Sequence, residues 1–238
     1  MSDELMTKFS IFVNEIGKYL SKDLIIGEVV VETKEDGSYV SNWDLNIQGF
    51  VLENARLNFP DFQLISEESP FQFNSLGNYI VLDPIDGTEN FVSGIPIWGV
   101  GIAFFVNSKL KASAVFFPEI GMYKYSKLLK VSEPFFREFR KTSHKSRIVG
   151  FSSNSNWSAA LDNFGLENRV LGCALFNLTL AVNGSIDFIG SDAGSMVWDI
   201  APGLLFALEN NQTVFVNERK YFGEFLDPTQ RHTFRIIS

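Results

Sequence analysis

Residues 79–96 read Y-I-V-L-D-P-I-D-G-T-E-N-F-V-S-G-I-P, and the rest of the chain is organised around this stretch. The apolar run Tyr79–Leu82 predicts a buried strand. Asp83 follows it, and Pro84 then lacks the N–H group that a sheet ladder needs. The stretch therefore predicts a buried strand that stops at an acidic side chain.

A second acid and a helix start follow this predicted strand. Asp86 comes three residues after Asp83, and Gly87 and Thr88 then begin what reads as a helical turn. Carboxylates bind hard cations, and the free N–H groups at a helix start bind anions. The same residues also fit a plain Asp-Pro, Asp-Gly surface turn. The pattern alone therefore leaves two interpretations: a site for a metal and a phosphate, or a turn.

The composition is that of a globular chain. It has 238 residues, of which 45% are hydrophobic and 14% aromatic, enough for a sizeable core. The longest apolar stretch, Ile95–Val106, is too short and too interrupted by glycine to span a bilayer. The N-terminus is acidic and lacks a secretion signal, and the single cysteine, Cys173, fits a reducing compartment. We therefore expect a cytoplasmic protein.

The charge of the chain limits its partners and its metals. A net charge of −8 disfavours nucleic acid or an anionic membrane as a partner. Two histidines and one cysteine are too few for a usual structural zinc site, and no P-loop, G-x-G-x-x-G or G-x-S-x-G motif occurs. A metal site would therefore use Asp and Glu oxygens, which favours Mg²⁺, Mn²⁺ or Ca²⁺.

The first half of the chain predicts helices followed by a meander. Apolar spacing predicts an amphipathic helix over 4–20 and a second helix from Asp44, which could be its N-cap. A short strand over 62–66 ends in Glu67-Glu68, a pair that is either solvated or binds a ligand. Strand-like runs at 98–106, 110–117 and 121–125 suggest an antiparallel meander.

The second half returns to alternating strands and helices, so we expect a layered α/β or α+β fold with 1–238 in one domain. Its halves, about 1–126 and 147–238, are joined by a basic run at 137–147. That run is a solvated connection, an extra phosphate contact or a nucleic-acid contact. The expected elements are strands at 147–152, 169–171, 186–189 and 213–216, helices at 155–164 and 173–182, a loop at 190–197, and a helix from Asp199 with Pro202 in its first turn.

Three motifs in this order resemble the signature of the inositol monophosphatase family. They are Glu67-Glu68-Ser69, the run D-P-I-D-G-T-E-N-F at 83–91, and Trp198-Asp199-Ile200-Ala201; G-C-A-L-F-N at 172–177 adds to them. The resemblance spans nearly the whole chain. It implies a Mg²⁺-dependent, lithium-sensitive phosphomonoesterase with a layered αβαβα fold. Members are often homodimers, so it also implies a homodimer that acts on a small phosphorylated metabolite.

The resemblance implies a role for each acidic residue. Asp83 would bridge two metals, and Glu67 with the backbone carbonyl of Ile85 would complete the first site. Asp86 and Asp199 would hold the second. The active site as a whole would bind two or three Mg²⁺ ions, with Mn²⁺ as a substitute.

The remaining roles concern water, phosphate and substrate. Backbone N–H groups of Gly87 and Thr88 would bind phosphate oxygens. Asp44 would pair with Thr88, and together with Glu67 they would orient the attacking water. The resemblance also implies substrate contacts from Lys34, Asp192 and Ala174, although Lys34 alone reads as an ordinary exposed lysine.

The chain departs from the family where a substrate would be recognised. The loop 68–79 is short, the segment after Tyr125 lacks a glycine-rich hairpin, and the last motif reads W-D-I-A-P-G. Inositol monophosphate is the namesake substrate; histidinol phosphate, fructose 1,6-bisphosphate and 3′-phosphoadenosine 5′-phosphate stay open. A catalytically silent binding protein would be expected to lose metal ligands or Thr88, and all are present.

Overall fold

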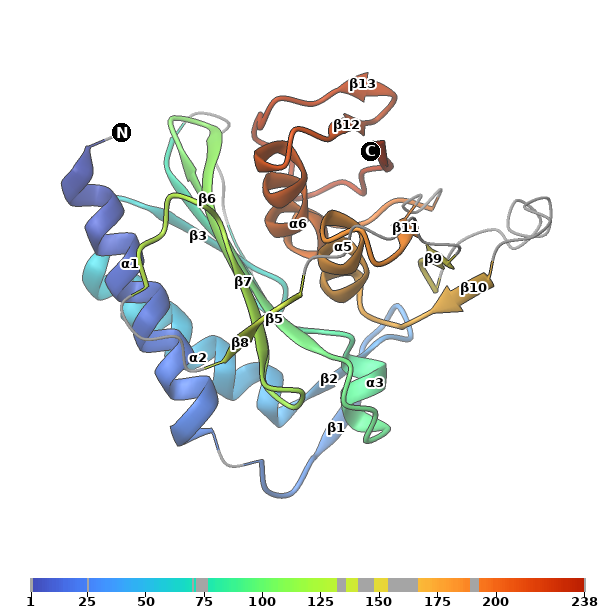
Figure 1. Ribbon diagram of the computed structural model, residues 1–238. Helices are drawn as coiled ribbons and strands as arrows, with labels where there is room; N and C mark the ends of the chain where they lie inside the picture. Colours follow the sequence, from blue (N-terminus) through green and yellow to red (C-terminus); the bar gives the residue numbers. More distant parts are fainter. Residues whose placement is uncertain are drawn as a thin grey trace.

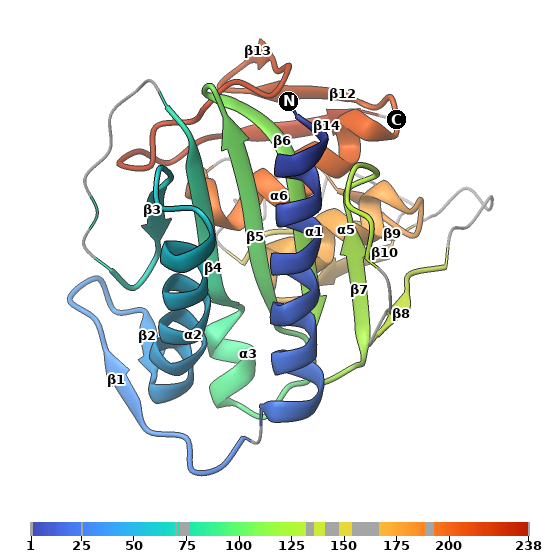
Figure 2. The same ribbon diagram turned by 90° about the vertical axis from the view of Figure 1, so that its left-hand side faces the viewer.

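The computed structural model describes residues 2–24, 26–69, 71, 77–131, 136–140, 148–153, 167–188 and 193–237. Helices and sheets alternate in layers (Figures 1 and 2). Helices α1 and α2 cover one face of a central sheet, and α5 and α6 cover the other. Two small sheets lie beyond α5 and α6. The expected layered fold is confirmed over this part of the chain, while the helix expected at 155–164 falls outside the described residues.

The central sheet has six strands in the order β3-β4-β5-β6-β7-β8. Strands β4 to β7 pair antiparallel in succession, which confirms the expected meander. The edge strands β3 and β8 run parallel to their neighbours β4 and β7. The strands are β3 (Gln63–Ser66), β4 (Tyr79–Asp86), β5 (Gly99–Val106), β6 (Lys109–Phe117), β7 (Met122–Tyr125) and β8 (Arg137–Glu138).

Strand β5 contributes side chains to two hydrophobic cores, one on each face of the central sheet. Every residue of β5 is buried, and alternate side chains point to opposite faces. Ile102 and Phe104 pack against the side of α1 and α2, whereas Ala103 and Phe105 pack against the side of α5 and α6. A strand buried on both faces reads as a continuous apolar run, which is what the sequence has here.

The N-terminal helices are α1 (Asp3–Lys18), which continues into a π-helical turn at Tyr19–Asp23, and α2 (Asn42–Asn58). The alternative that Asp44 is simply the N-cap of α2 is excluded. Ser41 is the N-cap, and Asp44 lies at the third helical position, where its Oδ2 accepts a hydrogen bond from the Ser41 N–H at 2.7 Å. A short hairpin, β1 (Val31–Thr33) and β2 (Tyr39–Ser41), leads into this helix.

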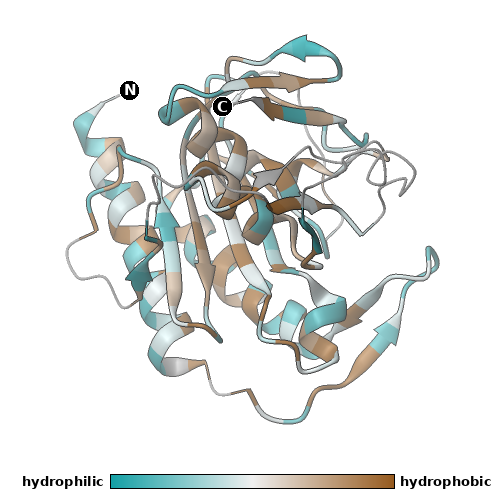
Figure 3. Cartoon of the chain, turned by 45° about the vertical axis from the view of Figure 1, so that its right-hand side comes forward, coloured by the Kyte–Doolittle hydropathy of each residue, from teal (hydrophilic) through white to brown (hydrophobic). Residues whose placement is uncertain are grey.

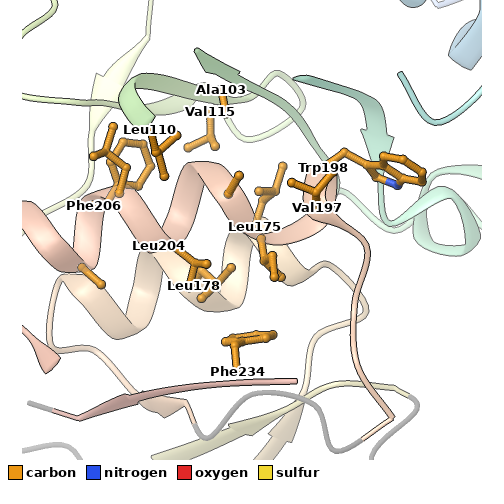
Figure 4. Close-up of a cluster of buried hydrophobic side chains, with 14 of the residues drawn as sticks. Ala103, Leu110, Val115, Leu175, Leu178, Val197, Trp198, Leu204, Phe206 and Phe234 are labelled. Atoms are coloured by element: carbon orange, nitrogen blue, oxygen red, sulfur yellow. The ribbon is translucent and has the colours of Figure 1, made fainter. Parts of the chain in front are cut away.

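Helices α5 (Ala174–Val182) and α6 (Val197–Glu209) pack on each other and on the sheet. Figure 4 shows the apolar side chains between them, including Leu178 and Leu204. The expectation that α6 begins at Asp199 is wrong, because the helix begins two residues earlier. Pro202 therefore lies in the second turn of α6 and not in the first.

The small sheets place the C-terminal segments. Strand β9 (Ile148–Phe151) lies between β10 (Glu167–Val170) and β11 (Asp187–Phe188), both parallel to it. Strand β12 (Thr213–Val216) lies between β13 (Arg219–Lys220) and β14 (Phe234–Ile237), both antiparallel. Figure 3 shows hydrophilic residues on the outer β12–β13 hairpin. Among the helices that the structure describes, none is both long enough and apolar enough to cross a membrane.

Candidate active site

The sequence predicts that the strand stops at Asp83. In the structure, β4 continues to Asp86. Its pairing with β5 shifts between Asp83, which is opposite Gly101, and Asp86, which is opposite Gly99. The irregularity accommodates Pro84, which cannot donate to the ladder. Both carboxylates are buried as a result.

Three carboxylates from distant segments converge beside this bulge. One oxygen each of Glu67, Asp83 and Asp199 lies within 4.8 Å of the other two. Glu67 follows β3, Asp83 lies in β4 and Asp199 lies in the first turn of α6. Asp83 Oδ1 is buried and has no hydrogen-bond partner among the described residues. A buried carboxylate oxygen without a partner is costly unless a cation satisfies it.

The electrostatics of the cluster favour a cation. Burial raises the pKa of Glu67 to about 7, against the opposing charge of Lys34. Burial, and then the charges of Glu67 and Asp86, raise the pKa of Asp83 well above its ordinary range, and the same causes act on Asp199. Like charges in a low dielectric resist ionisation together. The cluster therefore holds more negative charge than its neighbours balance.

Asp86 is oriented separately, by the start of α5. Its Oδ2 accepts hydrogen bonds from the Cys173 thiol at 2.9 Å and from the Leu175 N–H at 2.6 Å. Burial raises the pKa of Asp86, and these hydrogen bonds oppose that shift. Asp86 is outside the converging set found among the described residues, although its charge acts on Asp83 and Asp199.

Asp44 and Thr88 meet next to the carbonyl of Ile85. Asp44 Oδ2 accepts from both the N–H and the hydroxyl of Ser41, at 2.7 and 2.6 Å. Asp44 Oδ1 lies 3.4 Å from Thr88 Oγ1, which lies 2.9 Å from the Ile85 carbonyl oxygen. The single Thr88 hydroxyl proton thus has two acceptors, and the shorter distance favours Ile85. Burial raises the pKa of Asp44, against the hydrogen bonds from Ser41.

Gly87 permits the turn from β4 into α3 (Thr88–Val92). Its φ of +89° is left-handed, and a Cβ there would lie 3.0 Å from the Gly172 carbonyl oxygen. A side chain at this position would both strain the backbone and push away the segment before α5.

Lys34 is not an ordinary exposed lysine. Its Nζ lies 3.2 Å from Glu67 Oε1 and also contacts Glu68. Burial lowers its pKa, but the two carboxylates outweigh that effect, so the pKa of Lys34 is raised. The β1–β2 hairpin therefore brings one positive charge to the edge of the acidic cluster.

A pocket of about 190 Å³ opens beside the cluster. Asp86, Asp199 and Ala174 line it, so Ala174, one of the three predicted substrate contacts, lies next to two of the predicted metal ligands. Lys34 is not among the lining residues of this pocket, and Asp192 lies outside the described residues. The remaining lining residues are Ser152, Ser153, Gly172, Cys173, Asn177, Gly194, Ser195 and Arg231.

Sequence reasoning missed two residues that hold this arrangement together. Gln48 on α2 donates to Ser69 Oγ at 2.8 Å and accepts from the Ser66 hydroxyl, so it fixes both ends of the Glu67-Glu68 loop. Asn90 on α3 donates to the carbonyls of Ile97 and Leu171, each at 2.7 Å. The available signal for Gln48 was its position four residues after Asp44, on the same helix face. For Asn90 it was its place within the 79–96 stretch.

Comparison with known proteins identifies the relationship. The sequence model of the inositol monophosphatase family matches residues 6–233. The chain belongs to this family. It is 32% identical over 227 residues to the uncharacterized protein y4fL of Sinorhizobium fredii, covering 85% of this chain and 77% of that protein.

Other members of the inositol monophosphatase family agree in fold and differ in name. The fructose-1,6-bisphosphatase/inositol-1-monophosphatase of Thermotoga maritima is 27% identical, over 71% of this chain and 68% of that enzyme. The crystal structure of an IMPase/NADP phosphatase complexed with Mg²⁺ and phosphate superposes with a TM-score of 0.74, at 21% identity, over 99% of this chain and 89% of that one. The fold of the family is therefore shown.

The residues of this family member fit Mg²⁺. Hard divalent ions prefer carboxylate and carbonyl oxygens, and the cluster offers carboxylate oxygens from three segments. Asp83 Oδ1 has no hydrogen-bond partner in the described part of the chain, and the pKa of Glu67 is raised; a bound cation would satisfy the oxygen and offset the repulsion.

Proposed function

We propose that this chain hydrolyses a small phosphate monoester in a Mg²⁺-dependent reaction, with an inositol phosphate or a related sugar or polyol phosphate as substrate. The observation that carries the proposal is the convergence of Glu67, Asp83 and Asp199. Within it, Asp83 Oδ1 is buried and has no hydrogen-bond partner among the described residues. Phosphate monoesters are among the slowest biological bonds to hydrolyse unaided, and two-metal sites are one established solution.

The proposed ligands come from five positions. Asp83 would bridge two ions, Glu67 and the Ile85 carbonyl would complete one site, and Asp86 with Asp199 would complete the other. When bound, the ions supply charge neutralisation and lower the pKa of a coordinated water. Hydrogen bonds from the Cys173 thiol and the Leu175 N–H fix the orientation of the Asp86 carboxylate. Binding a metal would therefore require little further ordering of that side chain.

The protein itself would position the attacking water. Ser41 holds Asp44 through Oδ2, which leaves Oδ1 directed at the Thr88 hydroxyl. When the Thr88 hydroxyl donates a hydrogen bond to Asp44, its oxygen lone pairs can accept a hydrogen bond from water. The water is then oriented and rendered more nucleophilic by Thr88, with the Glu67 carboxylate at the same edge.

Backbone groups would bind the phosphate. The left-handed Gly87 turns the chain so that α3 begins directly after the bulge. The Gly87 and Thr88 N–H groups would donate to phosphate oxygens there, beside the bound ions that balance the phosphate charge.

The test is phosphate release from inositol 1-phosphate, fructose 1,6-bisphosphate, histidinol phosphate and 3′-phosphoadenosine 5′-phosphate. Each is assayed with Mg²⁺, with EDTA, and with Mg²⁺ plus Li⁺. We expect Mg²⁺-dependent, Li⁺-inhibited turnover. Asp83→Asn should lower turnover at least about 100-fold, since it replaces a central ligand oxygen.

The matched control for this test is Asp61→Asn, which removes the same charge from an exposed position after α2. It should leave turnover unchanged. Phosphate release by Asp83→Asn at the rate of the unchanged protein would exclude the proposed chemistry.

A further inference from the structure

We infer that the substrate carries a second anionic group and that Arg231 recognises it. The inference rests on the proposed phosphatase function and names the class of substrate for that same pocket. It follows from the position of Arg231, from the groups that share its pocket, and from the balance of charge around them.

The segment that carries Arg231 is fixed to the loop before α6. Ser195 and His232 form an antiparallel bridge, with the Ser195 N–H donating to the His232 carbonyl at 3.0 Å and the reverse bond at 2.8 Å. Arg231 Nη1 donates to the Gly194 carbonyl at 3.2 Å. Asp199, a proposed metal ligand, follows in the first turn of α6. The backbone of Arg231 is therefore held close to the proposed metal site.

The neighbouring residue, His232, anchors the segment that carries Arg231. Its ring is buried, with Nε2 at 2.8 Å from the Asp227 carbonyl oxygen and Nδ1 at 3.0 Å from Asn217 Nδ2. Asn217 Oδ1 also accepts from the Thr233 N–H at 3.1 Å. Residues on one side of Arg231 are thus anchored through side chain and backbone, while Arg231 itself is exposed at the pocket.

The pocket brings opposite charges together. Asp86 and Asp199 line it, and Arg231 is the one cation among its described lining residues. The neutral polar lining comes from Ser153, Asn177 and other side chains. A guanidinium has five N–H donors, and among the described residues Arg231 uses a donor only on Gly194. Most of its hydrogen-bonding capacity is therefore available to a ligand.

The charge balance indicates what that ligand is. The chain carries a net charge of −8, and Lys34 at the other edge of the site is already paired with Glu67 and Glu68. The charge of Arg231 also acts on Asp199, lowering a pKa that burial raises. The charge of Arg231 acts on Asp36 as well, but it forms no close ion pair with either carboxylate among the described residues, and a neutral polyol would not supply one to the guanidinium. A phosphate or carboxylate on the leaving group would match its planar fork.

The experiment compares pairs of esters that differ in the second anionic group. Fructose 1,6-bisphosphate is set against fructose 1-phosphate for a second phosphate, and 6-phosphogluconate against glucose 6-phosphate for a carboxylate. The readout is the ratio of kcat/KM within each pair, with Mg²⁺ present. We expect kcat/KM for the ester with the second anionic group, divided by kcat/KM for the ester without it, to exceed one. The pair with the larger ratio shows whether the recognised group is a phosphate or a carboxylate.

Arg231→Gln should lower that ratio about tenfold, the size expected for a partly exposed charge-assisted contact. Arg231→Lys keeps the charge without the fork and should recover part of it. The matched control is Arg235→Gln on β14, an exposed arginine that lies 4.9 Å from the Phe215 ring centroid. It removes the same charge and should keep the ratio of the unchanged protein.

The two failures can be told apart. Mg²⁺-dependent turnover with the same ratio in Arg231→Gln overturns the inference and leaves the proposed function standing. Phosphate release from none of the esters counts against the proposed function instead. Calorimetric titration of the same pairs then decides the inference. Tighter binding of the doubly anionic ester that is lost in Arg231→Gln supports it, and equal binding of both esters overturns it.

Discussion

At the scale of single residues, Asp44 combines a structural and a proposed catalytic role in two separate oxygens. Oδ2 holds Ser41 at the start of α2, and Oδ1 faces Thr88. Asp44→Asn keeps the size of the side chain but leaves one acceptor atom in place of two, so with its oxygen held by Ser41 it cannot accept the Thr88 hydrogen bond. We expect kcat to fall about 10²- to 10⁴-fold with KM nearly unchanged, because the orientation of the attacking water is lost and binding is not. Steady-state kinetics with Mg²⁺ measures both constants.

The control for this change is Glu53→Gln, which removes a charge from an exposed position of the same helix. It should leave kcat and KM as they are. A thermal melt of each variant separates lost chemistry from lost folding. Full retention of kcat in a folded Asp44→Asn protein would remove Asp44 from the proposed mechanism.

The acids of the site could be named from the sequence, whereas the residues that position them could not. Asp83 stands out because it follows an apolar run and precedes proline, and Asp86 because it comes three residues later, before glycine. Asn90 has no such signal, since one of its partners, the Leu171 carbonyl, is separated from it by most of a sheet and a small domain layer. Arg231 lies in a C-terminal segment with no motif that marks it. Only the tertiary structure, which places it beside Gly194, points to a role for it.

At the scale of elements, apolar periodicity located the bodies of the helices and strands but misplaced several ends. The apolar spacing predicts helices that start at Asp44 and Asp199, but each of these residues lies at the third helical position. Both accept a hydrogen bond from the N-cap residue's N–H, at 2.7 Å from Ser41 and 2.8 Å from Met196. Apolar spacing does not predict such caps, because they depend on which side chain accepts a hydrogen bond from which backbone N–H group.

The contact between α5 and α6 gives a prediction at this scale. A Cβ on Gly203 of α6 would lie 2.5 Å from the Leu178 Cβ on α5, so the two helices must separate to admit it. Gly203→Ala should therefore lower the free energy of unfolding by about 1–3 kcal/mol, through overpacking. Urea unfolding measures the change. Because Asp199 lies on the same helix, Mg²⁺ affinity should weaken as well.

Gly49→Ala is the matched substitution in α2, where nothing lies within 4 Å of the new Cβ. It should raise the free energy of unfolding by about 0.5–1 kcal/mol, since alanine is the better helix former. The same chemical change thus has opposite signs at the two sites. Destabilisation by both would mean that packing at Gly203 is not the cause.

At the scale of the whole molecule, a single cluster couples stability to pH and to metal. Burial raises the pKa of Glu67 from an ordinary 4.5 to about 7, and the pKa values of Asp83 and Asp199 shift in the same direction. The charged groups that act on Glu67 come from the β1–β2 hairpin, α2 and the loop itself: Lys34, Asp44 and Glu68. The fold therefore concentrates acids from several segments, and it does so at the cost of their mutual repulsion.

The sign of the resulting pH dependence follows from proton counts. Between pH 4.5 and about 7 the folded chain without metal keeps a proton on Glu67 that the unfolded chain has released. The folded state then binds more protons, so stability falls as pH rises through this window. In EDTA, we expect the melting temperature to fall between pH 5 and pH 8.

Bound Mg²⁺ should remove this loss, because it takes the place of the protons on the same oxygens. At a Mg²⁺ concentration of about 100 times Kd, we expect the melting temperature at pH 8 to rise by about 5–10 °C. The rise should be smaller at pH 5, where protons compete with the ion. In Asp83→Asn it should largely disappear, while Asp61→Asn should keep it. An equal rise at both pH values would show that Mg²⁺ binds away from the raised-pKa cluster, and the converging carboxylates would then need another explanation.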